Sequence, residues 1–162
     1  MEIIFDEYQV RRLPPRERLA KVKQILRSEK DESIRWDGVW LAGEITDGMD
    51  TKDPMFAEVA DLLAWVLHND PNTIVKHEAA FQIGARNMRN KIPDLVNAAL
   101  YDESELVRHE SVEGLGLIRD QGCKEALRSM LEDPSKPVRE TAAFVLKRLA
   151  RGRGNYKVEK IV

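Results

Sequence analysis

The sequence predicts an all-α protein, a superhelix of about four helical hairpins, because one ten-residue pattern occurs four times along the chain. The copies align without gaps and begin at Ile34, Val75, Val107 and Val138. Spacings of about 30 to 45 residues are typical of helical solenoids, in which each repeat packs only on its neighbours. We therefore expect a single repeat domain over residues 1–150, followed by a basic tail over residues 151–162.

Each copy is the second helix of a hairpin, and the preceding segment supplies the first helix. These first helices are predicted at Pro15–Arg27, Pro54–His68, Ile92–Tyr101 and Lys124–Leu131, all of which carry apolar residues at helical spacing. A proline near a helix start costs little, since the amide at that position has no partner within the helix. The segment Gly43–Asp53 is expected to be a longer acidic insertion between the first and second hairpins.

An acidic residue precedes a basic residue by six positions in every repeat. The four pairs are Glu29 and Arg35, Asp70 and Lys76, Asp102 and Arg108, and Asp133 and Arg139. Each acid can cap the helix that follows, and it can pair with the base of a neighbouring repeat. This ladder, together with the pattern V-R-x-x-A-x-x-x-L-G, resembles HEAT repeats, and the resemblance implies a HEAT-like solenoid.

Composition narrows the function classes. The formal net charge of −2 gives no general attraction to nucleic acid, so no nucleic-acid partner is expected. The single cysteine, Cys123, excludes an intramolecular disulfide framework and favours a reducing compartment. The amino-terminal segment is acidic where a secretory signal is basic, and no apolar run approaches the ~20 residues of a membrane span. These features predict a cytoplasmic protein with no membrane partner.

A His-Glu pair occupies the same position in the two middle repeats, as His77–Glu78 and His109–Glu110. On a helical wheel both members flank the apolar stripe, so we expect them at the rim of the core. Equivalent helices of stacked repeats lie about 8–10 Å apart, so the two imidazoles could reach one metal ion. Imidazole and carboxylate ligands with open positions are typical of non-haem iron sites.

A glycine follows each histidine by seven positions, Gly84 after His77 and Gly116 after His109. Both glycines lie on the histidine side of the helix. A missing side chain there leaves room either for a ligand or for another backbone.

The outer repeats lack the pair. Trp36 and Asp37 stand at these positions in the first repeat, and Glu140 and Thr141 in the fourth. A repeat consensus alone would not place His-Glu only in the middle. Asp37 and Glu140 are still acids at the rim and could contribute to a site.

The segments KHEAAFQIGA (76–85) and RHESVEGLG (108–116) are similar to the His-Glu motifs of deoxyhypusine hydroxylase. The resemblance implies a HEAT-repeat, non-haem di-iron monooxygenase that hydroxylates a lysine-derived side chain on a translation factor. It makes His77 and His109 candidate iron ligands. Glu78 and Glu110 become candidate iron-binding or bridging carboxylates.

This chain departs from that family in having two motifs where the family has four. It therefore resembles half of such an enzyme and could supply the ligands of about one iron. A symmetric homodimer would restore four motifs, and two-fold dimers are the commonest assembly. We expect a homodimer on this ground.

Other interpretations of the same residues stay open. The two histidines could be surface residues copied by repeat duplication, and Glu113, four positions after His109, could be an alternative ligand or a local partner of that histidine. Trp40 and Phe81 occupy equivalent positions and could line a pocket or an interface. A non-enzymatic HEAT adaptor that binds protein partners on its concave surface is the second function hypothesis. The two hypotheses differ in whether the His-Glu pairs are enclosed or face water.

Overall fold

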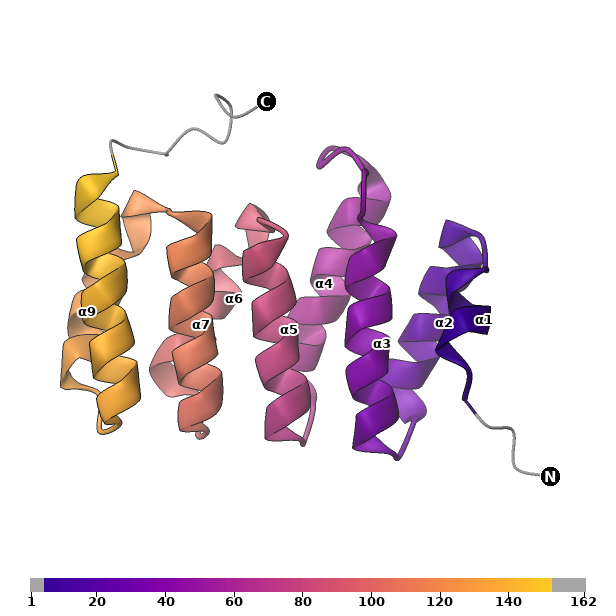
Figure 1. Ribbon diagram of the computed structural model, residues 1–162, viewed down its shortest axis with the longest axis horizontal. Helices are drawn as coiled ribbons and strands as arrows, with labels where there is room; N and C mark the ends of the chain where they lie inside the picture. Colours follow the sequence, from indigo (N-terminus) through magenta and orange to yellow (C-terminus); the bar gives the residue numbers. More distant parts are fainter. Residues whose placement is uncertain (1–4, 153–162) are drawn as a thin grey trace. The chain divides into compact units, whose positions relative to one another are not determined.

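The computed structural model describes residues 5–152, and within that range every regular element is helical, as the sequence predicts (Figure 1). The α-helices are α1 (Glu7–Arg11), α2 (Pro15–Ser28), α3 (Glu32–Ile45), α4 (Pro54–Asn69), α5 (Thr73–Ala85), α6 (Ile92–Tyr101), α7 (Glu105–Ile118), α8 (Lys124–Ser129) and α9 (Lys136–Arg151). Three short 3-10 helices are η1 (Arg89–Lys91), η2 (Gln121–Cys123) and η3 (Met130–Glu132). No helix within residues 5–152 is both long and apolar enough to cross a bilayer.

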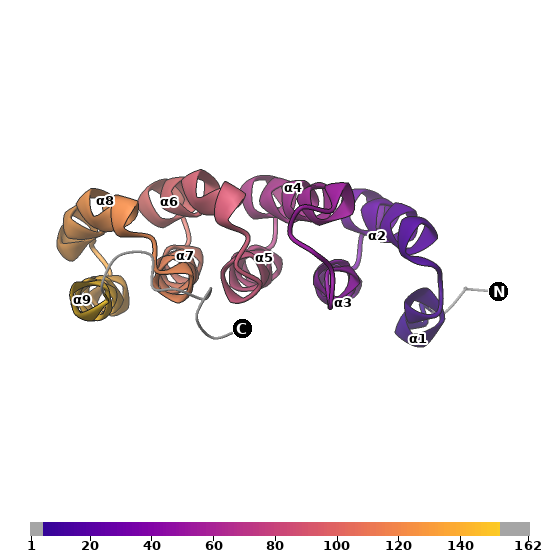
Figure 2. The same cartoon turned by 90° about the horizontal axis from the view of Figure 1, so that it is seen from above.

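The chain divides into two compact units, Met1–Gln82 and Ile83–Val162, with the division inside α5. Within the first unit, α2 and α4 form one layer and α3 packs against both (Figure 2). The core between these helices contains the fully buried Val22, Leu41 and Leu63. Gly38 allows α3 to approach α2 closely, because a Cβ there would lie 3.0 Å from Cγ2 of Ile25.

Within the second unit, α6 and α8 form one layer while α7 and α9 form the other (Figure 2). Leu95, Leu115 and Leu127 are fully buried between the layers. Gly116 of α7 lies against α9, since a Cβ on it would be 2.8 Å from Cγ2 of Val145. Each unit therefore shows the hairpin packing that the repeat pattern predicts.

Two of the ladder acids, Asp70 and Asp133, pair with the base of the preceding repeat, as the sequence predicts. Arg35 donates from Nε to Oδ2 of Asp70 at 2.8 Å and from Nη2 to Oδ1 at 3.1 Å. Arg108 binds Asp133 in the same way, at 2.9 and 3.1 Å. In both arginines Nη1 donates to backbone carbonyls of the turn that precedes its own helix. Each of these arginines therefore ties two repeats together through one planar group.

The other prediction, that these acids cap the helices, was wrong by two residues. The N-cap of α7 is Ser104, whose Oγ accepts a hydrogen bond from the Val107 amide, and the N-cap of α3 is Asp31. The ladder acid Asp102 instead accepts from the amide of Ser104 at 2.9 Å. The acid orders the turn that presents the capping residue, because a short carboxylate reaches the amide two positions ahead most easily.

Several boundaries differ from the sequence prediction. The predicted helix Lys124–Leu131 ends as α8 at Ser129 and tightens into η3, which brings the chain to Pro134 without continuing the helix. Helix α3 continues to Ile45, so the insertion begins later than Gly43. Helix α9 extends to Arg151, the first residue of the predicted tail, and residues 153–162 lie outside the described residues.

Candidate metal centre

Three potential metal ligands lie together on one turn of α7. They are His109, Glu110 and Glu113, and one donor atom from each lies within 4.8 Å of the others. The distance between Nε2 of His109 and Oε1 of Glu113 is 3.8 Å. Glu110 is buried, with 5% of its surface exposed, whereas the side chains of His109 and Glu113 are 30% and 48% exposed. The cluster thus runs from the core to solvent.

The spacing of these residues explains why they converge. Glu113 follows His109 by four positions and Glu110 by three, and both separations place side chains on the same helix face. At metal–ligand distances of about 2.1 Å, ligands at right angles are about 3.0 Å apart and opposite ligands about 4.2 Å. The observed distances approach this range, and the exposed Glu113 can close the remainder by rotation. The donor set fits a divalent cation.

The equivalent motif on α5 has a different environment. His77 is half-buried and Glu78 is buried, with 7% of its surface exposed. The carboxylate Oε1 of Glu78 accepts a hydrogen bond from Nε2 of Gln82, one helical turn further on, at 3.3 Å. Phe81 stands where α7 has Glu113.

The expectation that both members of each pair merely flank the core was wrong for the glutamates. Glu78 and Glu110 are buried, whereas the histidines are half-buried. A wheel drawn on one helix does not include the side chains of neighbouring helices, and these cover the glutamate side. A buried carboxylate is costly unless it is paired, hydrogen-bonded or bound to a cation, and the hydrogen bond from Gln82 partly meets this need for Glu78.

The first repeat carries Trp36 where the second carries the histidine of its His-Glu motif. Trp36, at the His77 position, lies 6.1 Å from Trp40 between ring centroids, and Trp40 lies 6.1 Å from Phe81. Trp36 lines a depression of about 350 Å³ together with Glu32, Ser33, Asp37 and Ile74. Trp40 and Phe81 pack in a row beside Trp36.

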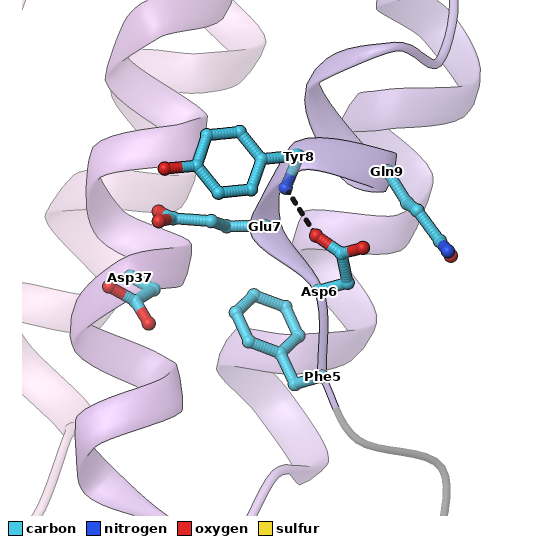
Figure 3. Close-up of a pocket in the computed structure, with 6 residues that line it drawn as sticks. All are labelled: Phe5, Asp6, Glu7, Tyr8, Gln9 and Asp37. Carbon is cyan, nitrogen blue, oxygen red and sulfur yellow. Dashed lines mark hydrogen bonds between the residues drawn. The ribbon is translucent and has the colours of Figure 1, made fainter.

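Asp37, at the Glu78 position, lines a second depression with α1, of about 410 Å³ (Figure 3). The other lining residues are Phe5, Asp6, Glu7, Tyr8 and Gln9. Burial and the negative charge of Glu7 raise the pKa of Asp37, and the positive charge of Arg11 partly offsets them. This depression could not be predicted from the repeat pattern, because α1, a five-residue helix, lies outside that pattern.

The two glycines after the histidines serve backbone and side-chain packing. A Cβ on Gly84 would be 2.5 Å from the Cα of Gly114, so the last turn of α5 meets α7 backbone to backbone. Gly116 makes room for Val145 of α9. Of the two alternatives for these positions, the structure therefore supports packing.

Cys123 is a buried residue of η2, and its Sγ lies 3.0 Å from the carbonyl oxygen of Asp120. Burial and the nearby Asp120 charge raise the pKa of the thiol to about 11. A protonated, buried thiol is a poor nucleophile and a poor ligand, so Cys123 has a structural role.

The fold and the repeat pattern define a class of protein before any activity is considered. The family described as HEAT repeats matches residues 60–147, more than half of the chain, and the chain belongs to this family. Its helical hairpins, and the arginine–aspartate salt bridges between them, are those of a HEAT-repeat protein.

Among proteins of named activity, the chain is similar to deoxyhypusine hydroxylases. The enzyme of Phaeosphaeria nodorum is 37% identical over 79 residues, which are 48% of this chain and 24% of that protein. The Saccharomyces cerevisiae enzyme is 26% identical over 144 residues, 86% of this chain and 44% of that one. The structure of human deoxyhypusine hydroxylase in complex with glycerol matches with a TM-score of 0.71 at 24% identity, over 85% of this chain and 45% of that one. The chain spans less than half the length of these relatives.

Proposed function

We propose that this protein is an iron-binding HEAT-repeat protein and acts as a non-haem di-iron, oxygen-dependent hydroxylase of the deoxyhypusine hydroxylase type. The observation that carries the proposal is the burial of Glu78 and Glu110 beside half-exposed histidines in two consecutive repeats. Buried carboxylates beside imidazoles are donors that a divalent cation can use. The similarity to named deoxyhypusine hydroxylases over these repeats supports the same proposal.

The iron ligands in this proposal are His77, Glu78, His109 and Glu110. The imidazoles would bind the iron as neutral donors, and the carboxylates would offset its charge. An iron pair supplies the activation of molecular oxygen. The chain itself holds the donors on α5 and α7, and Ser104 caps the start of α7.

The homodimer completes the site in this proposal. One chain carries two His-Glu motifs, and a second copy related by a two-fold axis supplies the other two. The protein substrate would enter between the two copies and present a lysine-derived side chain to the metal.

The test is iron analysis of untagged protein, combined with sedimentation. About one iron per chain, a visible absorption spectrum and a dimer are expected. The His77→Ala/His109→Ala double variant should lose the iron and the spectrum while keeping its helical circular dichroism. Absence of metal after anaerobic loading with Fe(II) would reject the metal-based function, and a monomer that retains iron would reject the dimer.

A HEAT adaptor is the second candidate function, and one observation favours it. Phe144 of α9 is 64% exposed and Leu117 of α7 is 50% exposed, so the second unit presents large apolar side chains to solvent. Such residues can anchor a protein partner. In that case the chain would bind no metal, and the Phe144→Ser variant would lose its partner while the double histidine variant would keep it.

A further inference from the structure

The first repeat presents an aromatic and acidic surface to solvent. Its depression of about 350 Å³ is lined by Trp36 and Ile74, together with Glu32, Ser33 and Asp37. The Ile74 side chain is largely exposed, and Trp36 is half-buried. Apolar side chains that are exposed inside a depression are typical of a binding site, whereas a single apolar residue on a convex surface needs no explanation.

The depression beside α1, of about 410 Å³, continues this surface because Asp37 lines both (Figure 3). It adds the rings of Phe5 and Tyr8 and the acids Asp6 and Glu7. Of the described residues that line the two depressions, four are acidic and none is a lysine or an arginine. The surface is therefore complementary to a cationic group that is attached to something apolar or flat.

Two of these four acids are already engaged within the chain. Asp6 caps α1, and Glu7 pairs with Arg11 at 3.2 Å. The side chains of Glu32 and Asp37 make no hydrogen bond or ion pair with another residue of the described part of the chain. Burial and the Glu7 charge raise the pKa of Asp37, so an external cation beside Asp37 would offset the cost of its negative charge.

The chain itself shows which cation suits such rings. Arg27 lies over the Trp65 ring, 5.2 Å from its centroid, and Arg11 lies over the Tyr8 ring at 5.6 Å. Among residues 5–152, no cation lies over Trp36. A guanidinium group stacks on an indole and binds a carboxylate through two parallel hydrogen bonds, whereas the compact, strongly hydrated ammonium of lysine does neither as well.

We propose that this surface binds an arginine side chain on a basic segment of a partner protein. The guanidinium stacks on the Trp36 indole and pairs with Asp37, and Glu32 adds negative charge to the same depression. The residues next to that arginine cross the depression beside α1. A depression open to solvent suits a side chain that reaches out from a partner. This inference goes beyond the proposed function and requires no metal.

The experiment is a fluorescence anisotropy titration of the full chain with a fluorescein-labelled peptide. The peptide carries two arginines separated by glycine between Gly-Ser flanks, and its counterpart carries two lysines. The arginine peptide should bind about fivefold more tightly than the lysine peptide, and Trp36→Leu and Asp37→Asn should each weaken it about fivefold. Glu17→Gln is the matched control, because Glu17 is an exposed acid of α2 outside both depressions, and it should bind as the wild type does.

Two further measurements separate binding from misfolding. Asp37→Asn should lose affinity without losing stability, because the wild-type carboxyl carries a raised pKa and the amide keeps its shape. In NMR spectra of the wild type, the arginine peptide should shift the indole N–H signal of Trp36. The Trp65 signal should stay in place, since Arg27 already covers that ring.

Three outcomes would overturn the proposal. The first is equal affinity for the arginine and lysine peptides, or no binding of either. The second is unchanged affinity in both Trp36→Leu and Asp37→Asn, or an equal loss in Glu17→Gln. The third is a dimer that forms without peptide and dissociates in Asp37→Asn, which would assign the surface to a second copy of this chain. All three leave the iron proposal standing, because the assays contain no metal.

Discussion

Gly84 and Gly114 meet backbone to backbone, since a Cβ placed on Gly84 would lie 2.5 Å from the Cα of Gly114. The contact fixes how the last turn of α5 packs on α7, next to the turn that carries the proposed metal ligands. Neither backbone can move without shifting a helix, so a side chain at this position cannot be accommodated locally.

We expect Gly84→Ala to lower the free energy of unfolding by about 2 kcal/mol, in spite of the roughly 1 kcal/mol that alanine gains over glycine within a helix. Chemical denaturation followed by circular dichroism measures the change. Gly38→Ala is the control, because its nearest neighbours are the side-chain ends of Ile25 and Leu26, which can move. An equal or smaller loss for Gly84→Ala than for Gly38→Ala would contradict the close contact.

The salt bridge between Arg108 and Asp133 should make a contribution to the free energy of unfolding that depends on pH. Burial alone would raise the pKa of Asp133, but hydrogen bonds from Arg108 and from the Ser135 amide outweigh it and hold the pKa below its ordinary value. A carboxyl group with a lower pKa in the folded state stabilises the fold above its unfolded pKa of about 3.9. That stability is lost as the pH falls through the folded value.

Arg108→Met should therefore destabilise the protein by about 3 kcal/mol at pH 7, because it leaves a buried carboxylate without its charge partner. The variant should also show a smaller loss of stability between pH 5 and 3 than the wild type. Arg128→Met is the control, since its pair with Glu125 is exposed and should change stability by less than about 0.5 kcal/mol. If wild type and Arg108→Met lost the same free energy of unfolding as the pH falls, the salt bridge between Arg108 and Asp133 would contribute nothing to the pH dependence.

The effect of Asp37 on stability should have the opposite pH dependence to that of Asp133. Burial and the Glu7 charge raise its folded pKa, so its ionisation costs stability as the pH rises through the acidic range. Asp37→Asn should increase the free energy of unfolding at pH 7 by less than about 1 kcal/mol. Titration of the Asp37 carboxyl by NMR should give a raised pKa that falls in Glu7→Gln. A value at or below that of an exposed aspartate would contradict this account.

Metal binding should stabilise the folded chain through mass action. At a free metal concentration of 100 times the dissociation constant, the expected gain is about 2.7 kcal/mol, which raises Tm by several degrees. Thermal melts with and without Co(II) measure the shift, and a chelator should reverse it. The His77→Ala/His109→Ala variant should melt at one temperature under all three conditions. A metal-dependent shift that survives in this variant would place the cation elsewhere.

The sequence by itself determined the helical repeat, the positions of the hairpins and the identity of the motif residues. These features depend on short-range periodicity, which a single helix and its partner already satisfy. The rungs Arg35–Asp70 and Arg108–Asp133 could also be predicted, because a constant six-residue offset repeated along a solenoid places each acid near the preceding base.

Tertiary structure determined the features that a helical wheel of one helix cannot show. The burial of Glu78 and Glu110, the use of Gly84 for a backbone contact, and the depression beside Asp37 all depend on side chains from other helices. Pairwise spacing along one helix brings Glu113 to His109, but only packing removes Glu110 from water. Burial is a property of the neighbours, and the sequence pattern of one helix does not contain them.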